Sequence, residues 1–512
     1  MKKIALLGFA AIISNVAANS QTAQPNEMAF RIKAEAFNNS QIEPIAQYMT
    51  DFLGSRLEAS KMKLRAEDLV MAELDSIGLK NSKVEFAYEF EKGGWDNERN
   101  YVAMTAPYYC SFAANPKAWS GSTDGEVKGE CVLFEATDVE GLEKYKGQLN
   151  GKIVLMPQRG EYELSFEPEA TRYTKEELQE MKADPRGVSR KGRYRWDPSR
   201  MKLQAAVDSF FREERPLAVI SGDGVFNVPG SRGVRYKSGD PQPVPEIILP
   251  VEDHGRMVRL VKNGIPVEME IDIRNTFTDN QQINNVIVEI PGTDPKLKNE
   301  VVLLGAHLDS WHGGTGAADD AAGCITMMEA LRILNDLGVK PRRTIRLALW
   351  GGEEQGLYGS RGYAKNRLYD SEKGEKKPEF DNFVLYLNND FGGGRYRGIY
   401  LEENDMAFPF FEVWKKPLES LGFETLSPQR TGSTDHVSFN SIGLPAYQFI
   451  QDPLDYFRTY HSTMDTYERL PLDDMRVNAA IVAWLAYSAA MDDNRIPVKP
   501  GFPKKQERRM PW

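Results

Sequence analysis

The sequence predicts an α/β protein with a mostly parallel mixed sheet that helices cover on both faces, and with a β-rich domain inserted into it. Two observations lead to this fold class. After residue 280, apolar runs of strand length alternate with stretches of helical periodicity, as in parallel strands joined by crossover helices. Between residues 98 and 274, short apolar runs are instead separated by glycine and proline, which is typical of a mainly β domain.

The first twenty residues have the pattern of a secretory signal peptide, which we assign to residues 1–20. Lys2 and Lys3 precede an apolar run, and small residues lead to a cleavage site before Gln21. The run is shorter than the roughly 20 residues that a membrane-spanning helix needs, so an uncleaved anchor is the less favoured alternative. We therefore expect an exported protein, periplasmic or extracellular, without stable membrane insertion.

The helical pattern from residue 47 to 79 predicts one helix before the β-rich region. In that region we expect strands at 129–134, 151–156, 217–221, 246–250 and 267–273. In the α/β region we expect strands at 285–290, 301–304, 344–350, 383–387 and 445–450, with helices at 320–337, 409–421 and 473–491. The tail at 497–512 is rich in proline and basic residues, and we expect it to be loose.

Composition excludes some classes of protein. A net charge of −10 argues against a dedicated nucleic-acid-binding protein, so we expect no nucleic-acid partner and interpret the basic stretch from Arg172 to Lys202 as a solvated surface insertion. Three cysteines are too few for a disulfide scaffold in 512 residues. Cys110 and Cys131 lie in the same β-rich region, and the sequence leaves open whether they are bridged.

Histidine and acidic residues follow three of the predicted strands at the point where each ends. His307 comes after the first of these strands, Glu353 and Glu354 after the second, and Asp390 after the third. Ligands of open α/β sheets bind beyond the carboxyl ends of the strands, so we expect these side chains to converge. Asp319, at the start of the next helix, adds another acid; taken alone, such an acid is usually a helix cap.

Several carboxylates in one small volume repel one another unless a cation compensates them. One or two divalent metal ions would do so, and a mixture of imidazole and carboxylate ligands suits Zn²⁺. Two metal ions bridged by a carboxylate form the co-catalytic arrangement of aminopeptidases. The sequence therefore predicts a metal site at this edge of the sheet.

These segments resemble the di-zinc exopeptidase family that includes bacterial leucyl aminopeptidases, carboxypeptidase Q and glutamate carboxypeptidase. The likeness is clearest in His-Leu-Asp-Ser-Trp from His307, Gly-Ala-Ala-Asp-Asp from Gly316, Trp-Gly-Gly-Glu-Glu-Gln-Gly from Trp350, Asn389-Asp390, and Tyr-His-Ser-Thr-Met-Asp-Thr from Tyr460. The resemblance implies a phosphorylase/hydrolase-like zinc peptidase fold. It divides the chain into a discontinuous peptidase domain (28–97 and 275–495) and an inserted protease-associated domain (98–274).

The resemblance also implies a role for each site residue. Two Zn²⁺ ions per chain would be held by five ligands, with Asp319 bridging them: His307, Asp319, Glu354, Asp390 and His461. Glu353 would be the general base that takes a proton from the metal-bridging water. Asp309 would orient His307, and the peptide bond between Asp319 and Asp320 would be cis.

The expected function is a zinc-dependent exopeptidase acting on peptides, as an aminopeptidase or dipeptidase. A carboxypeptidase of the carboxypeptidase Q type is the main alternative; a glutaminyl cyclase with one zinc and a non-catalytic binding protein are less favoured. Candidate substrate-binding residues are Asp435, His436, Arg395 and Arg430, and either arginine would suit a substrate carboxylate. We expect His312 at the pocket rim and His254 on the surface. A homodimer is left open.

Overall fold

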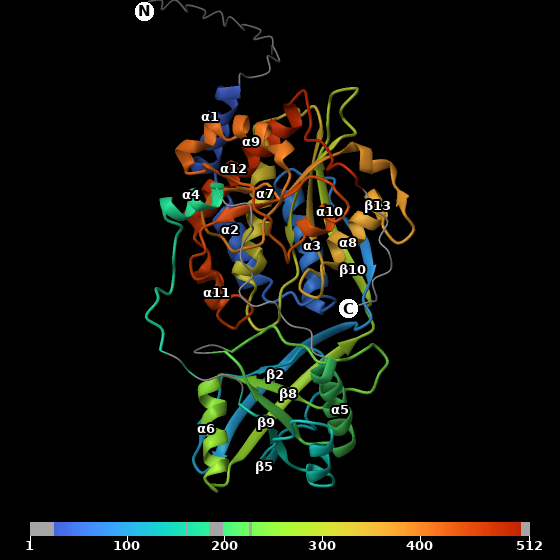
Figure 1. Ribbon diagram of the computed structural model, residues 1–512, viewed down its shortest axis with the longest axis vertical. Helices are drawn as coiled ribbons and strands as arrows, with labels where there is room; N and C mark the ends of the chain where they lie inside the picture. Colours follow the sequence, from blue (N-terminus) through green and yellow to red (C-terminus); the bar gives the residue numbers. More distant parts are fainter. Residues whose placement is uncertain (1–24, 159–161, 163, 184–197, 225–227, 503–512) are drawn as a thin grey trace, which may run out of the picture.

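The computed structural model describes residues 25–158, 162, 164–183, 198–224 and 228–502. The predicted signal peptide at residues 1–20 lies outside the described residues. The chain forms two lobes, a larger one that contains α7, α12 and β10 and a smaller one that contains β5, β9 and α6 (Figure 1). Among the described residues, no helix is both long and apolar enough to cross a membrane.

The larger lobe is built on an eight-stranded mixed sheet. In spatial order its strands are β1 (Lys83–Glu89), β10 (Gln282–Ile290), β12 (Thr344–Trp350), β11 (Val301–His307), β15 (Phe383–Asn388), β18 (Ala446–Gln451), β16 (Tyr396–Tyr400) and β17 (Thr425–Ser427). The central strands β12, β11, β15 and β18 run parallel, and antiparallel pairs flank them. This confirms the predicted fold class.

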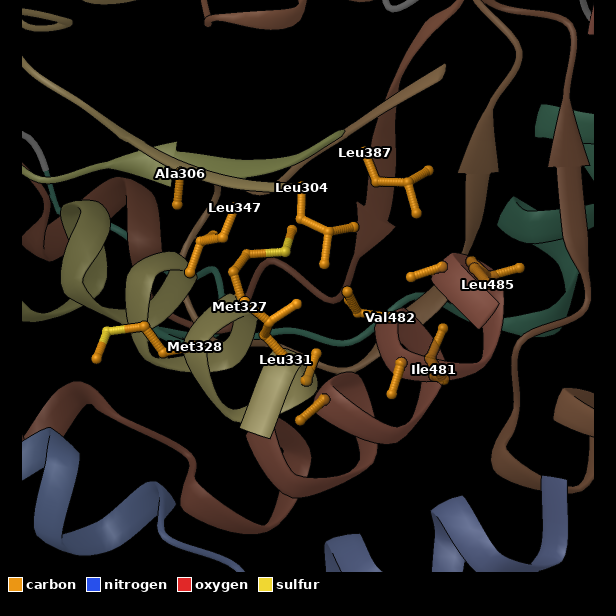
Figure 2. Close-up of a cluster of buried hydrophobic side chains, with 14 of the residues drawn as sticks. Leu304, Ala306, Met327, Met328, Leu331, Leu347, Leu387, Ile481, Val482 and Leu485 are labelled. Carbon is orange, nitrogen blue, oxygen red and sulfur yellow. The ribbon is translucent and has the colours of Figure 1, made fainter. Parts of the chain in front are cut away.

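Helices cover both faces of this sheet because its central strands alternate apolar side chains between the two sides. Leu304 and Leu347 face α7 (Ala322–Asp336) and α12 (Leu472–Met491), as Figure 2 shows. Leu303 packs on the opposite side with residues of α8 (Tyr358–Tyr363) and α10 (His436–Asn440). Full burial of such a leucine contributes about 1.5–3 kcal/mol, which explains why these strands read as continuous apolar runs.

The remaining helices and short strands of the larger lobe lie around this core. They are α1 (Pro25–Asn38), α2 (Ile42–Gln47), α3 (Lys61–Ser76), α9 (Phe408–Trp414), α11 (Tyr456–Thr459), β13 (Tyr369–Asp370) and β14 (Glu375–Lys376). The single helix expected over 47–79 is wrong. The chain leaves helical geometry after Phe52, buries Arg56, and starts α3 only after Ser60, whose Oγ accepts the Lys63 N–H at 3.1 Å as an N-cap.

The smaller lobe contains a second eight-stranded sheet and two long helices. Its strands in spatial order are β3 (Cys110–Ser111), β2 (Gly94–Ala106), β9 (Glu268–Thr278), β5 (Val127–Leu133), β6 (Ile153–Leu155), β7 (Ala218–Gly222), β8 (Glu246–Leu249) and β4 (Asn115–Pro116). Strands β5 to β8 run parallel. Helices α5 (Pro198–Glu214) and α6 (Val251–Lys262) were not predicted from the sequence.

The two lobes are joined through the antiparallel pair β2 and β9. Strand β2 follows β1 in the chain, β9 leads into β10, and β1 pairs with β10. The smaller lobe is thus inserted between two neighbouring strands of the larger sheet. The β2–β9 pair begins with Gly94 paired to Thr278. The insertion therefore starts four residues before the expected limit of 98 and ends four residues after the expected limit of 274.

A strap, residues 164–183, runs from the smaller lobe onto the larger one and ends in α4 (Lys175–Ala183). Thr171 pairs with Leu454, and Nη1 of Arg172 lies 2.9 Å from Asp452 Oδ2 and 2.7 Å from Asp474 Oδ2. Leu178 is buried beside strands of the larger sheet. The interpretation of residues 172–202 as a solvated insertion is therefore wrong for Arg172 and Leu178, which have partners in the larger lobe.

Two other expectations also fail. His254 is fully buried rather than on the surface, because α6 packs its ring against β7, where a Cβ on Gly222 would lie 2.7 Å from the ring. The first residues of the 497–512 tail are not loose, since the Lys499 N–H donates to the Gly443 carbonyl at 3.1 Å. Residues 503–512 lie outside the described residues.

The question of a disulfide between Cys110 and Cys131 has a structural answer. Both cysteines are free. They lie on β3 and β5, with β2 and β9 between them in the sheet. Three strand spacings amount to about 14 Å, whereas the Cα atoms of a disulfide lie within about 7 Å of each other.

Candidate metal centre

The carboxyl ends of β11, β12 and β15 deliver the predicted residues to one edge of the larger sheet. His307 is the last residue of β11 and lies opposite Trp350, the last residue of β12. Glu353 and Glu354 follow in the next turn, while Asp390 follows β15 on the other side of β11. Parallel register therefore brings together acids and an imidazole that are far apart in the sequence.

Asp319 lies between the two histidines of the site. Its Oδ1 is 3.1 Å from His307 Nε2, and its Oδ2 is 3.0 Å from His461 Nε2. On one side, Asp390 Oδ1 lies 3.7 Å from His307 Nε2; on the other, Glu354 Oε2 lies 2.9 Å from His461 Nε2. All five predicted ligands thus form two adjacent groups that share one carboxylate.

Asp320 is a further acid within reach of His307 and Asp390. Its Oδ1 accepts the Gly323 N–H at 3.0 Å, and its Oδ2 accepts the His307 N–H at 3.3 Å. These bonds use both oxygens to cap α7 and to fix β11. Asp319, whose oxygens face the two imidazoles, has the better geometry for a bridging ligand. The peptide bond between the two aspartates is cis, as expected.

Asp309 fixes the orientation of the site in two ways. Nδ1 of His307 donates to the Asp309 main-chain oxygen at 3.0 Å, which turns Nε2 toward the acids. The Asp309 carboxylate accepts the N–H groups of Glu353 and Glu354 at 3.1 and 3.2 Å. The expected link to His307 therefore passes mainly through the main chain, while the carboxylate holds the turn that carries the two glutamates.

The charges in the site perturb one another strongly. Burial alone would lower the pKa of His461, but Asp319 and Glu354 raise it to about 11. Burial likewise opposes protonation of His307, yet the neighbouring carboxylates raise its pKa well above the usual value. Burial and the charge of Asp390 raise the pKa of Glu353. Protonated imidazoles thus supply the positive charge that this cluster of acids requires.

The donor set also fits a metal ion. Carboxylate oxygens and imidazole nitrogens at tetrahedral sites are characteristic of zinc. Oε1 of Glu354 is buried and has no hydrogen-bond partner among the described residues. A metal ion would satisfy such an oxygen and would replace the protons on the histidines. Two groups of side chains could each hold one ion. The first is His307, Asp320 and Asp390, and the second is Asp319, Glu354 and His461.

The smaller lobe contributes to the surroundings of His461. The Gly230 N–H donates to the His461 carbonyl at 2.8 Å, and the Thr463 N–H donates to the Val228 carbonyl at 2.9 Å. These bonds support His461 in a left-handed conformation with φ of 57°. Near the same boundary, Nε2 of His312 donates to the Pro116 carbonyl at 2.7 Å. His312 therefore lies between the two lobes.

A small open pocket adjoins one of the two groups of ligands. Its lining comprises Trp311, Gly314, Gly316, Asp319, Glu354, His461, Ser462 and Asp465. Aromatic rings also link the two groups of ligands. Phe391, which directly follows Asp390, packs against Tyr456, and Tyr456 stacks on Tyr460, the neighbour of His461. Polar ligands with apolar neighbours are typical of substrate pockets.

The four candidate substrate-binding residues are dispersed. Asp435 is fully buried, burial raises its pKa to about 7, and its charge contributes to the raised pKa of Glu353. His436 is buried too, with Nε2 3.1 Å from Thr431 Oγ1 and 3.4 Å from Glu402 Oε1. Neither lines the pocket.

The two arginines are also outside the pocket lining. Nε of Arg395 lies 2.9 Å from Asp474 Oδ1, in the ion-pair cluster that holds the strap. Arg430 is exposed. The pocket lining contains no lysine or arginine among the described residues.

Sequence reasoning missed two buried residues at the site, Arg56 and Asp465. Both bind main-chain atoms of the metal-site loops. Main-chain partners leave no trace in residue spacing. For Asp465, the only signal was its place inside the Tyr460–Thr466 motif; for Arg56, the expected helix over 47–79 concealed its environment.

Comparison with known proteins agrees with this geometry. Residues 285–486 match Peptidase family M28. Carboxypeptidase Q of Mus musculus is 26% identical over 453 residues, which cover 88% of this chain and 85% of that protein. In fold, a peptidase M28 precursor of Shewanella amazonensis aligns with a TM-score of 0.65 and 23% identity over 93% of this chain and 99% of that one.

A zinc aminopeptidase of Bacillus subtilis aligns with a TM-score of 0.55 and 18% identity over 91% of this chain and 95% of that one. Together, the fold, the paired ligand groups and these matches define a hydrolase of the metallo-exopeptidase class. The match to peptidase family M28 covers residues 285–486, the segment that contains all five predicted ligands.

Proposed function

We propose that the protein is a co-catalytic di-zinc exopeptidase that removes residues from the end of peptides. The observation that carries this proposal is the position of Asp319, whose two oxygens lie 3.1 and 3.0 Å from the Nε2 atoms of two different histidines. A carboxylate shared in this way, with one more acid on each side, is the ligand arrangement of two adjacent metal ions. Zinc is supported by the donor set and by the zinc aminopeptidase of similar fold.

Zinc ions at these sites would polarise the scissile carbonyl and make water acidic enough to react near neutral pH. The chain supplies the proton acceptor. Glu353 lies in the turn fixed by Asp309, and its buried carboxyl, with its raised pKa, suits a group that takes a proton and later gives it to the leaving amine. Because Asp309 binds the N–H groups of both glutamates, the proposed base Glu353 and the proposed ligand Glu354 keep fixed positions relative to each other.

We infer that the substrate's free amino end, rather than its carboxylate, lies at the metal centre. The pocket is lined by three acids, Asp319, Glu354 and Asp465, whose negative charge would attract an ammonium group rather than a carboxylate. Of the two arginines that would have suited a substrate carboxylate, Arg395 is paired with Asp474, and Arg430 is exposed and outside the pocket lining. These contacts favour an aminopeptidase or dipeptidase. A carboxypeptidase of the carboxypeptidase Q type remains the second candidate, because the curated relative with 85% coverage has that name.

The test is a hydrolysis panel of one tripeptide in three forms, free, N-acetylated and C-amidated, measured with metal content. An aminopeptidase cleaves the free and amidated forms and spares the acetylated one. A carboxypeptidase cleaves the free and acetylated forms and spares the amidated one. Binding of about two zinc ions per chain, and loss of activity with a chelator, are expected. A protein that binds no zinc and is indifferent to the chelator would refute the proposal.

Three further assignments belong to this proposal. The smaller lobe would be a protease-associated domain that limits access to the site, supported by its contacts with the His461 segment. Export would follow from the signal-peptide pattern of residues 1–20. The substrate would be a short peptide and not a nucleic acid; a homodimer stays a prediction that sedimentation can test.

A further inference from the structure

The loop Gly313–Asp320 carries the shared carboxylate of Asp319 but has little regular structure of its own. It follows β11 and joins α7 through a tight turn in which Gly316 has a φ of 60°. A Cβ at Gly316 would lie 2.3 Å from the Cβ of Ser310. The position of Asp319 must therefore come from contacts that the loop makes with other parts of the chain.

Arg56 provides the first set of these contacts. Its side chain is fully buried, and its guanidinium donates to main-chain oxygens on both sides of the site. Nε reaches the Leu308 oxygen at 2.7 Å, next to His307, while Nη1 and Nη2 reach the oxygens of Thr315 and Gly316 at 2.7 and 3.0 Å. One planar group thus joins the strand end that carries His307 to the loop that carries Asp319.

Asp465 provides the second set from the other side. Its Oδ1 accepts the Ala318 N–H at 2.6 Å, and its Oδ2 accepts the Asp319 N–H at 3.1 Å. Its main-chain oxygen accepts the Thr315 N–H at 2.9 Å. Asp465 lies in the same turn region as His461, so it ties the second histidine's segment to the loop of the shared carboxylate.

We propose that Arg56 and Asp465 are positioning residues that set the distance of Asp319 from both metal sites. This inference rests on the proposed function, because it assumes that Asp319 binds two ions. Ligand positions must be held to within about 0.5 Å for a site to work. The main-chain contacts of Arg56 and Asp465 hold the loop at several successive points up to Asp319 itself: Thr315, Gly316, Ala318 and Asp319.

A purely electrostatic role for Arg56 predicts the opposite outcome. A buried positive charge beside a metal site repels cations, so neutralising it would tighten metal binding. A positioning role instead depends on the planar fork, which a lysine cannot reproduce although it carries the same charge. Arg56→Lys and Arg56→Met therefore separate geometry from charge.

The matched control is Arg343, a second fully buried arginine. Its guanidinium also donates to main-chain oxygens, including that of Ala489 at 3.2 Å. It directly precedes β12, so it lies at the opposite end of that strand from Glu353 and Glu354. Arg343→Lys should therefore lower thermal stability without changing metal affinity.

The measurement is the zinc Kd of the full chain, obtained by competition with a chromophoric chelator, together with the melting temperature of the metal-free protein. Arg56→Lys should raise the Kd of at least one zinc by roughly 10–100-fold, the usual cost of losing contacts that orient metal ligands. Arg56→Met should weaken binding as well. Arg343→Lys should leave both Kd values within twofold of the wild type.

Asp465→Asn gives an independent readout if Arg56 variants do not fold. Its amide can accept only one of the two N–H groups, so zinc binding should again weaken. Unchanged Kd values in folded Arg56→Lys or Asp465→Asn, or tighter binding in Arg56→Met, would overturn the inference. Failure of the wild type itself to bind zinc would instead refute the proposed function.

Discussion

Two buried histidines, one in each lobe, show how the same side chain acquires opposite properties. His307, at the end of a parallel strand, faces the oxygens of Asp319 and Asp390, and its pKa is raised. His254 packs on a parallel strand of the smaller lobe, where burial lowers its pKa to about 4. Burial disfavours the charged form in both places, and only the larger lobe provides carboxylates that reverse the effect. Parallel strands in both lobes therefore bury a histidine, but only the carboxylates beside His307 favour its charged form.

The largest expected effect comes from removing the proposed proton acceptor in the larger lobe, Glu353. Glu353→Gln keeps the size and the main-chain bonds to Asp309 but cannot take a proton. We expect kcat to fall by about 10²–10⁴-fold with zinc content unchanged. Steady-state kinetics and metal analysis check this, with the exposed Glu372→Gln as control. Retention of more than a tenth of the wild-type kcat would exclude Glu353 as the base.

Removal of the metal ions should destabilise the larger lobe more than the smaller lobe. The proposed zinc ligands are assembled only in the folded larger lobe, so zinc at 100 times its Kd should stabilise that lobe by about 2.7 kcal/mol. Hydrogen exchange with and without chelator should show faster exchange in β11 and α7 after metal removal, and little change in β5 and β6. Equal acceleration in both lobes would show that metal binding and the smaller lobe are coupled.

The strap should respond to a single charge deletion. Arg172→Ala removes the contacts of Nη1 with Asp452 and Asp474. Because the arginine is half exposed, and Arg395 and Arg397 still accompany the two aspartates, we expect a loss of only about 0.5–1 kcal/mol. Limited proteolysis near residues 164–183 should become a few times faster, while kcat on a tripeptide stays within twofold. Arg232→Ala, an exposed pair within the smaller lobe, should leave the cleavage rate unchanged.

A last effect, which appears only when the pH is lowered, concerns the acid stability of the smaller lobe. The folded-state pKa of His254 is lowered from 6.5 to about 4, so the unfolded chain binds this proton more tightly. Its contribution is fully present above pH 6.5 and is lost as the pH falls toward 4, by up to roughly 3 kcal/mol.

His254→Leu should remove part of this pH dependence. Urea unfolding at pH 7.5 and 5.0, followed through the smaller lobe, should give a smaller difference for the variant than for the wild type. The exposed Arg232→Ala variant is again the control. An identical pH dependence in wild type and His254→Leu would exclude His254 as its source.

The parts of the molecule that could be predicted are those whose side chains share a periodicity. The apolar runs of β10, β11, β12, β15 and β18 are buried on both faces, so they stand out, and the acids that follow them fall at the same edge of the sheet. His254 was misplaced although its helix contains the needed signal. Val251, His254, Gly255 and Val258 are spaced as one buried face, and the rarity of buried histidines outweighed that pattern.

The contacts that could not be predicted are those with the main chain. Arg56 donates to carbonyl oxygens, which every residue possesses, so no residue type marks its partners. The strap presents a similar difficulty, because Arg172 pairs with acids about 280 and 302 positions away. Such pairings follow from the folded arrangement of the lobes and not from any local pattern.

The β2–β9 pair also shows how little the smaller lobe disturbs the larger sheet. Gly94 and Thr278 are paired neighbours, so the smaller lobe begins and ends at almost the same point in space. Chains tolerate whole-domain insertion best where the two ends of the insert lie close together. A hairpin turn between β1 and β10 would close the larger sheet with the pairing it already has. The smaller lobe therefore interrupts only a turn of the larger sheet and leaves the strand order of that sheet unchanged.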